Sequence, residues 1–247
     1  EAIRLLLESG AAPTNRDDDG QRALGLAVGS GSLEATEMLL EAGVEVPPDS
    51  EEQGSLALSA AEDGSVETLR LVLEEGAAPD VTADLNRTPL HYAAEQSGPK
   101  TRLLIEAGAP VDPIDEYGRP PLAFAAGGGQ TGAVRALLEA GADPTHTDPS
   151  GATLLHHAIS GGEEGPVRVL IEHGVDVNQA DESGTTPLHR AASMGKFGPA
   201  RVLLEAGADP QKTNNDGETP IQVDKGMLFQ SDFERMKTLI RNYMGGQ

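Results

Sequence analysis

Apolar residues recur along this chain in short groups separated by polar and glycine-rich stretches. The clearest group is a pair of aliphatic residues followed by glutamate, one variable residue and glycine, as in Leu39–Gly43 and Leu203–Gly207. Seven such groups close on glycines spaced 32 or 33 residues apart: Gly10, Gly43, Gly76, Gly108, Gly141, Gly174 and Gly207. Self-similarity at one fixed period predicts a repeat protein.

A second group runs in phase with the first. An alanine stands 15 or 16 residues before each closing glycine from Gly43 onward, and Thr88–Ala93 and Thr186–Ala191 both read Thr-Pro-Leu-His-x-Ala. Thr followed by Pro favours the start of a helix, and Leu and Ala three apart lie on one helical face. A glycine suits the left-handed residue that ends a helix. Each period therefore predicts two helices, and stretches such as Asp115–Gly118 predict tight hairpin turns between periods.

This signature and period resemble those of ankyrin repeats, over essentially the whole chain. The resemblance implies an all-α solenoid of helix-turn-helix units joined by β-hairpin fingers. One unit alone cannot cover its apolar face, so neighbours must stack. Within a single ankyrin repeat domain, 1–247, the fingers place a partial repeat at 1–13, repeats at 14–46, 47–79, 80–111, 112–144, 145–177 and 178–210, and a capping repeat at 211–247.

The ends and one linker depart from the pattern. Thr219–Val223 predicts one more inner helix, and about Asp232–Tyr243 its polar outer partner. The chain begins inside an outer helix, Glu1–Ser9, so we expect it to be a piece of a longer array. Repeat 80–111 is one residue short between its helices, near Ser97–Pro99.

Little in the sequence indicates catalysis. The chain has no cysteine, and it lacks a phosphate-binding glycine loop with its Lys-Ser/Thr partner. His156 and His157 near Glu163 and Glu164 could form a metal site, but His91, His156 and His189 share one slot of the signature. The ankyrin resemblance implies that histidine there hydrogen-bonds between repeats. We expect no catalytic residue, no metal and no cofactor.

The charge disfavours several classes of partner. There are 18 basic and 40 acidic residues, a net charge of −22, which opposes binding to nucleic acid or to anionic lipid. No apolar run approaches the ~20 residues of a membrane span. We expect no nucleic acid and no membrane partner, and a monomer inside the cell, in the cytoplasm.

The resemblance implies that a partner protein binds the concave surface made by the fingers and the inner helices. Acidic residues gather at the N-terminal end of this surface, where residues 1–83 hold 18 acids and 4 bases. They could capture a basic partner segment or serve only solubility. The acidic candidates are Asp18, Asp19, Glu51, Glu52, Glu62 and Asp63.

A second candidate group lies on two adjacent fingers. It consists of Leu85, Arg87, Tyr117 and Arg119, and Met194 occupies a similar exposed slot further along. Tyr and Arg are enriched at binding hot spots, although two arginines could also merely offset local acid. Phe124, just before a signature alanine, is interpreted as filling the core.

The sequence therefore predicts a protein–protein interaction module. The alternative is the targeting arm of a larger enzyme or signalling protein, which would bind a substrate or partner on the same surface. A spacer without a dedicated ligand is a third interpretation, and a histidine-based metallo-hydrolase a fourth.

Overall fold

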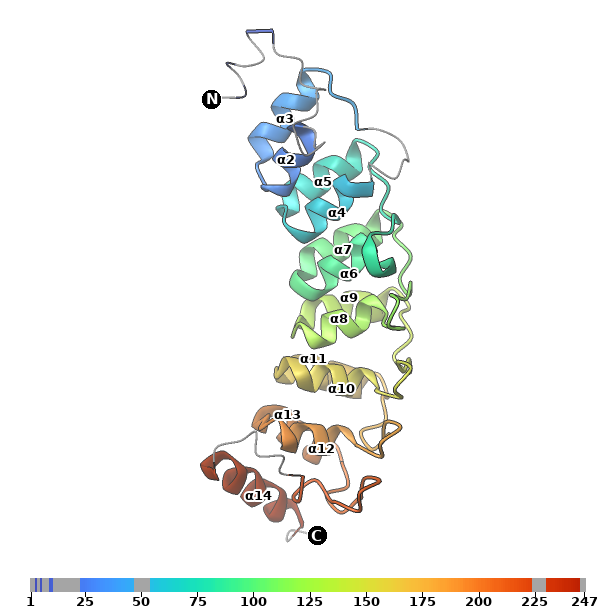
Figure 1. The fold of residues 1–247 in the computed structure, drawn as a ribbon, viewed down its shortest axis with the longest axis vertical. Helices are drawn as coiled ribbons and strands as arrows, with labels where there is room; N and C mark the ends of the chain where they lie inside the picture. The colour runs from blue at the N-terminus through green and yellow to red at the C-terminus, as the bar shows by residue number, and fades with distance from the viewer. Residues whose placement is uncertain are drawn as a thin grey trace.

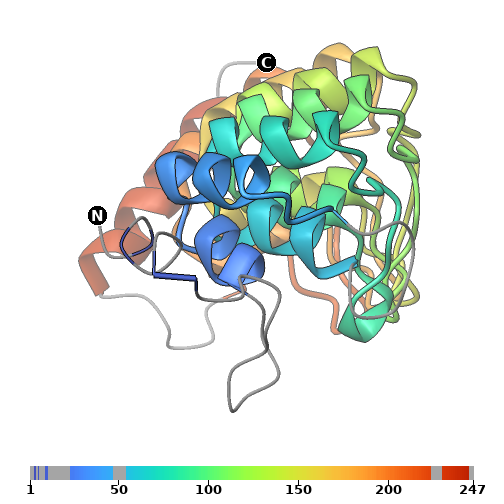
Figure 2. The same ribbon diagram turned by 90° about the horizontal axis from the view of Figure 1, so that it is seen from above.

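The computed structural model describes residues 3, 5, 9, 10, 23–46, 54–223 and 230–244, with the backbone alone at 54, 55 and 230–233. The helices lie one after another in an elongated stack (Figure 1). Viewed along the stack, they form two layers, and the loops that join successive repeats gather at one edge (Figure 2).

One layer holds the inner helices and the other the outer helices. The inner helices are α2 (Ala23–Gly29), α4 (Gly54–Glu62), α6 (Pro89–Gln96), α8 (Pro121–Gly127), α10 (Leu154–Gly161) and α12 (Pro187–Ser193). The outer helices are α3 (Leu33–Glu41), α5 (Val66–Glu74), α7 (Gly98–Glu106), α9 (Thr131–Glu139), α11 (Glu164–Glu172), α13 (Phe197–Glu205) and α14 (Gln230–Met244). Neighbouring helices pack against one another within each layer, and α2 to α13 also pack in pairs of one inner and one outer helix.

The helices begin and end where the signature predicts. Thr88 and Thr186 are the N-caps of α6 and α12, and a proline follows each in the first turn. The closing glycines from Gly43 to Gly207 have φ between +83° and +97°, a conformation that only glycine adopts readily. The two predicted helices per repeat are therefore confirmed for the repeats whose helices are described.

The core runs continuously along the stack. Leu90, Ala93 and Leu104 are fully buried in one repeat, and their counterparts Leu122 and Leu137 are fully buried in the next. Burying one leucine side chain stabilises the fold by about 1.5–3 kcal/mol. Since neighbouring repeats pack against one another, part of this stabilisation depends on stacking.

The fingers are hairpin turns with very short arms. In the finger 115–119 the N–H of Asp115 donates to the carbonyl of Arg119 at 3.0 Å, and the N–H of Asp181 donates to Thr185 in the same way. The described residues contain no strand, and the nearest approach to one is the isolated bridge between Thr147 and Thr153. One hydrogen-bonded pair is enough to close a turn and too little to make a ladder.

The C-terminal end differs from the prediction. Thr219–Gln222 forms a single turn, and no inner helix is present up to Val223, where this stretch of the description ends. The side-chain oxygen of Gln222 accepts the N–H and the hydroxyl of Thr219, both at 2.9 Å, as at a helix start, although no helix follows in the described residues up to Val223. The outer helix α14 is confirmed and extends beyond Asp232–Tyr243 at both ends.

Two other expectations concern the short linker in repeat 80–111 and the helix at the start of the chain. Ser97 ends α6 and is at once the N-cap of α7, so the short linker of repeat 80–111 is confirmed. At the start of the chain Ile3 and Leu5 are helical, and the rest of the predicted helix up to Glu8 lies outside the described residues.

Candidate partner-binding site

Four fingers share one hydrogen-bonding scheme at their tips. Asp115 Oδ1 accepts the N–H groups of Tyr117 and Arg119, both at 2.9 Å. Asp148, Asp181 and Asn214 open their own fingers and bind the N–H groups two and four residues later in the same way. The fourth residue of each finger is a glycine with φ between +71° and +77°, namely Gly118, Gly151, Gly184 and Gly217. The scheme therefore needs an acceptor first and a glycine fourth.

The finger 83–87 lacks both of these residues. It begins with Ala83, which has no acceptor side chain, and has Asn86 in place of the glycine. The N–H of Ala83 still donates to the carbonyl of Arg87 at 2.7 Å. Leu85 and Asn86 both take positive φ, +60° and +58°, and this conformation costs a residue such as leucine about 1–2 kcal/mol. The finger is closed by a strained turn rather than by a side chain.

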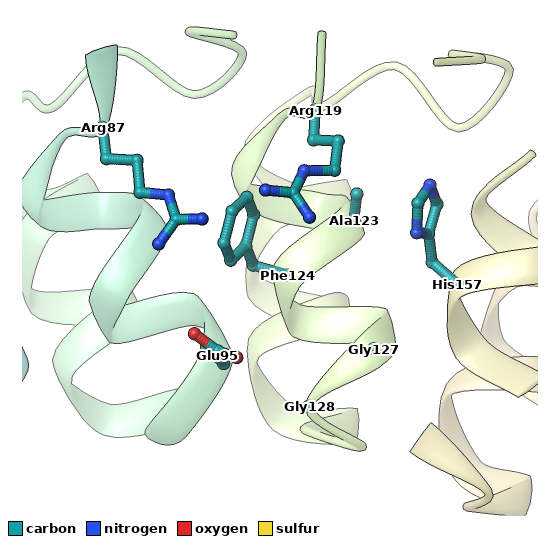
Figure 3. A pocket seen from close by; sticks show the side chains of 8 residues that line it. All are labelled: Arg87, Glu95, Arg119, Ala123, Phe124, Gly127, Gly128 and His157. Atoms are coloured by element: carbon teal, nitrogen blue, oxygen red, sulfur yellow. The ribbon is translucent and has the colours of Figure 1, made fainter. Parts of the chain in front are cut away.

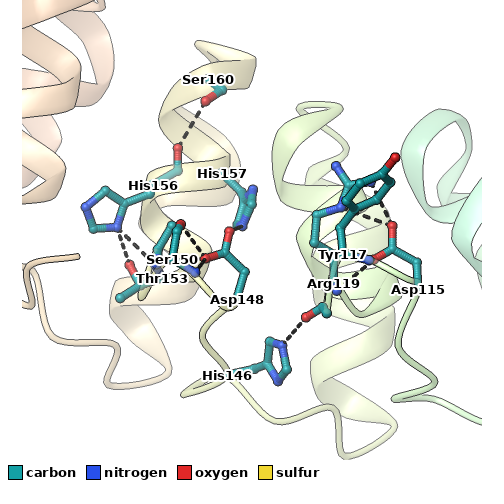
Figure 4. Close-up of polar contacts among 12 residues, drawn as sticks. Asp115, Tyr117, Arg119, His146, Asp148, Ser150, Thr153, His156, His157 and Ser160 are labelled. Atoms are coloured by element: carbon teal, nitrogen blue, oxygen red, sulfur yellow. Dashed lines mark hydrogen bonds and ion pairs between the residues drawn. The ribbon is translucent and has the colours of Figure 1, made fainter. Parts of the chain in front are cut away.

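The two arginines that end these neighbouring fingers are held differently. Arg119 donates to Asp115 Oδ2 through Nη2 at 2.7 Å and through Nε at 3.1 Å, as Figure 4 shows. Arg87 has no carboxylate at the opening position of its own finger, which is Ala83, and its Nε lies 3.8 Å from Asp115 Oδ2, too far for a hydrogen bond. This Nε is buried and has no hydrogen-bond partner. A buried donor in that state costs about 1–3 kcal/mol.

An aromatic ring lies between the two guanidinium groups. The central carbon of Arg87 is 4.9 Å from the centre of the Phe124 ring, and that of Arg119 is 4.8 Å from it (Figure 3). Arg119 also lies 4.9 Å from the ring of Tyr117, which is 55% exposed on its finger. Such contacts are worth about 0.5–2 kcal/mol each, and they fix the orientation of both arginines.

The two arginines and Phe124 line a pocket of about 250 Å³ on the inner-helix layer. It spans α6, α8 and α10, with the two arginines at the finger end and Glu95 near the other end (Figure 3). The lining residues are Arg87, Glu95, Arg119, Ala123, Phe124, Gly127, Gly128 and His157.

The charged groups of the pocket have defined protonation states. Burial alone would raise the pKa of Asp115, but its hydrogen bonds to Arg119 and the charge of that residue outweigh burial, and the pKa lies below its usual value. Burial lowers the pKa of His157, although Asp148 lies 3.4 Å from it and acts in the opposite direction. At neutral pH, Asp115 is therefore charged and His157 is neutral.

The signature histidines have a structural role. Nδ1 of His91 accepts the N–H of Thr88 at 3.0 Å, which leaves Nε2–H to donate to the carbonyl of Arg119 in the next finger at 3.1 Å. His156 and His189 make the corresponding contacts, each with the threonine at the start of its own helix and with a carbonyl in the next finger. Burial lowers the pKa of His91 to about 4. The predicted bonds between repeats are confirmed, and both nitrogens of His156 are occupied by them.

The predicted site residues fall into three groups. Arg87, Tyr117 and Arg119 belong to the arginine–phenylalanine cluster just described, and Leu85 lies beside it, 36% exposed. Glu62 and Asp63 are exposed at the end of α4, whereas Met194 lies at the end of α12, away from the cluster. Asp18, Asp19, Glu51 and Glu52 lie outside the described residues.

Sequence reasoning missed Asp115, and it found one of the two roles of Phe124, since the predicted place in the core is confirmed. Phe124 is buried, at 9% exposure, but guanidinium groups flank its ring, which lines the pocket as well as packing against the core. Two signals were available. Arg87 and Arg119 occupy the same slot of successive fingers, and Asp115 stands four residues before Arg119, where the preceding finger has Ala83.

The family model for ankyrin repeats (three copies) matches residues 56–148 and 141–214. The chain belongs to the ankyrin repeat family. Two crystal structures are similar to it over most of its length. The human ASB11 ankyrin repeat domain has 24% identity and a TM-score of 0.77, covering 92% of this chain and 100% of that domain. The ankyrin repeat domain of Bcl-3, described as a unique member of the IkappaB family, has 26% identity and a TM-score of 0.64, covering 90% and 99%. No curated protein sequence matched.

Membership in the ankyrin repeat family defines the class of function. Ankyrin repeat domains generally mediate protein–protein interactions, and the family is typically non-catalytic. In the part of the chain that the structure describes, no helix is both long and apolar enough to cross a membrane. That same part contains no group of three metal-binding side chains.

Proposed function

We propose that this ankyrin repeat domain binds a segment of a partner protein on the concave surface made by its fingers and inner helices. The observation that carries the proposal is the cluster of Arg87, Arg119 and Phe124, which lines a pocket on that surface beside the exposed Tyr117. Arginine and tyrosine beside a pocket are the side chains most often found at binding hot spots.

The geometry favours binding without a large entropic penalty. Both guanidinium groups are held against aromatic rings, and Arg119 is also fixed by two hydrogen bonds to Asp115. Side chains that are ordered before binding lose less conformational entropy when a partner arrives. The fingers are in turn tied to one another, since the N–H of Glu116 donates to the carbonyl of Leu85 at 2.9 Å.

The second part of the proposal concerns the exposed acidic residues. Glu62 and Asp63 are exposed at the end of α4, in a protein whose net charge is −22. We expect them to attract a basic stretch of the partner, so that association slows as salt rises. An association rate that does not change with salt concentration would show that the acidic residues take no part in attracting the partner. A monomeric state and a cytoplasmic location stay predictions.

The experiment that tests the proposal pairs a double variant with a matched control. The partner is captured with the wild-type domain, and its affinity is then measured for Tyr117→Ala/Arg119→Ala and for Arg135→Ala, whose side chain lies on the outer helix α9 and is 48% exposed. We expect at least a tenfold loss for the double variant and an unchanged affinity for the control. Equal affinities in folded proteins, checked by thermal unfolding, would place the partner elsewhere.

A further inference from the structure

The pocket between α6, α8 and α10 combines an excess of positive charge with an unused hydrogen-bond donor. Two guanidinium groups share one carboxylate, Asp115, and Arg119 takes both of its short contacts with Asp115 Oδ2. Arg87 is left 3.8 Å away. The finger end of the pocket therefore carries about one positive charge, in a chain with a net charge of −22.

Arg87 Nε needs an acceptor that the protein does not supply. It is buried without a hydrogen bond, whereas buried polar groups in proteins are almost always paired. The aromatic contact with Phe124 holds the guanidinium group, and its planar edge can bind a carboxylate through two parallel hydrogen bonds. Because Nε itself is buried, a ligand carboxylate at the finger end would bind the edge formed by the two Nη atoms of this group.

The size and charge of the pocket favour a single acidic side chain. A volume of about 250 Å³ lies below the range of about 300–1,000 Å³ typical for drug-sized ligands, so one side chain suits it better than a cofactor. A carboxylate balances the one surplus positive charge. A phosphate group carries about −1.5 to −2 and would leave the finger end negative.

Glu95 sets the orientation of the ligand. It lines the same pocket away from the arginines (Figure 3) and would repel a second acidic group. The net charge of −22 on the chain has the same effect on a strongly acidic segment. The ligand that fits is a lone acidic residue within a neutral or basic stretch, which agrees with the basic partner segment of the proposed function.

We infer that Arg87 and Arg119 bind the carboxylate of one Asp or Glu side chain in the partner segment, placed beside the Phe124 ring with Arg87 as the principal donor. This inference rests on the proposed function, because it names the chemical group that the same site recognises.

The test uses a library of random 12-residue peptides displayed on phage and selected on the full 247-residue chain. We expect the enriched peptides to share an Asp or Glu at one fixed position. In a representative peptide, replacing this residue by Gln or Asn should weaken binding to the wild type at least tenfold, about 1.4 kcal/mol. The same replacement should have no effect on binding to Arg87→Met, which keeps the aliphatic stem and loses the guanidinium group. Arg135→Met is the matched control and should retain the full tenfold effect.

The outcomes separate the two proposals. If peptides are enriched but their fixed position is apolar, aromatic or basic, or if the acid-to-amide penalty persists in Arg87→Met, the inference is wrong and the proposed function stands. If no peptide is enriched, the segment-binding function itself is wrong, and the inference falls with it. Thermal unfolding of Arg87→Met verifies its fold, and we expect little net change in stability because losing the contact with the Phe124 ring is offset by removing an unpaired buried donor.

Discussion

Two neighbouring fingers, 83–87 and 115–119, end in the same residue type and differ in the residue that opens them. In the second finger, Asp115 binds its own backbone and its own arginine. In the first, the side chain of Ala83 can accept no hydrogen bond, the turn takes two left-handed residues, and Arg87 Nε is left without a hydrogen bond. One repeat position thus decides whether an arginine completes its own finger or is available to a ligand.

The comparison also shows how function can arise from an imperfect repeat. A regular finger stabilises itself and uses its polar groups internally. The irregular finger contains strain at Leu85 and an unpaired donor at Arg87. Strain and unpaired buried groups tend to cluster at functional sites, and here both fall beside the pocket.

The largest expected effect comes from removing the carboxylate of the regular finger. Asp115→Ala deletes the acceptor of two N–H groups and of Arg119, and the Asp115 side chain is fully buried. We expect the free energy of unfolding to fall by about 3–5 kcal/mol, measured by urea denaturation. Asp181→Ala, which breaks the same backbone contacts without an arginine, should cost only about 1–2 kcal/mol. Equal losses would mean that the ion pair contributes nothing.

The second-largest effect is expected from acid, which should weaken the connection between the repeats 80–111 and 112–144. His91 links α6 to the finger 115–119 in its neutral form, and its pKa is about 4 when folded, below the usual 6.5. The unfolded chain therefore binds the proton first, so stability is complete above about pH 6.5 and falls as the pH drops toward 4. The loss from His91 is at most about 3 kcal/mol. The free energy of unfolding, measured by denaturation between pH 7 and 4, should change less with pH for His91→Gln than for the wild type. An identical pH dependence of the two proteins would contradict this.

Converting the irregular finger into a regular one should have a moderate effect on stability and a clear one on binding. Ala83→Asp/Asn86→Gly supplies the missing acceptor and the glycine, so we expect a gain of about 1 kcal/mol in unfolding free energy. Because the new carboxylate would engage Arg87, affinity for an acid-bearing peptide should drop about tenfold. An increase in stability without a change in affinity would show that Arg87 does not bind the ligand.

The smallest effect is expected from relieving strain at the finger tip. Leu85→Asn places a residue that tolerates positive φ where leucine has φ +60°, and we expect stability to rise by about 0.5–1 kcal/mol. The matched change Tyr117→Asn lies on the neighbouring finger, at a residue without positive φ, and should bring no gain. Thermal unfolding distinguishes the two, and a gain for both would show that backbone strain is not the cause.

The sequence was sufficient for the repeats because their signals are local. A glycine at a helix end and a Thr-Pro pair at a helix start act within one turn, so Gly43 or Thr186 can be interpreted without knowing what lies nearby. The C-terminal end shows the limit of such signals. Thr219 and Gln222 make the contacts of a helix start, but no helix follows up to Val223, because a local signal does not supply the packing on which most helical stability depends.

The site was predictable only in part because it joins residues from different repeats. Arg87, Tyr117 and Arg119 could be chosen by their finger slots. The position of Phe124 between two guanidinium groups depends on how the repeats stack, because Arg87 belongs to the preceding repeat and yet its guanidinium carbon lies 4.9 Å from the centre of the Phe124 ring. Ala83 looked unimportant because its effect is the absence of an acceptor.

The most direct test of the difference between the fingers is an NMR titration that follows the Nε–H signals of Arg87 and Arg119. The ligand is a selected acid-bearing peptide, and its amide counterpart is the control. We expect the acid peptide to shift the Arg87 signal strongly and the Arg119 signal little, since Arg119 is already bound to Asp115, and we expect the amide peptide to leave Arg87 nearly unchanged. Equal shifts at Arg87 with both peptides, or no shift with either at saturation, would contradict a carboxylate bound by Arg87.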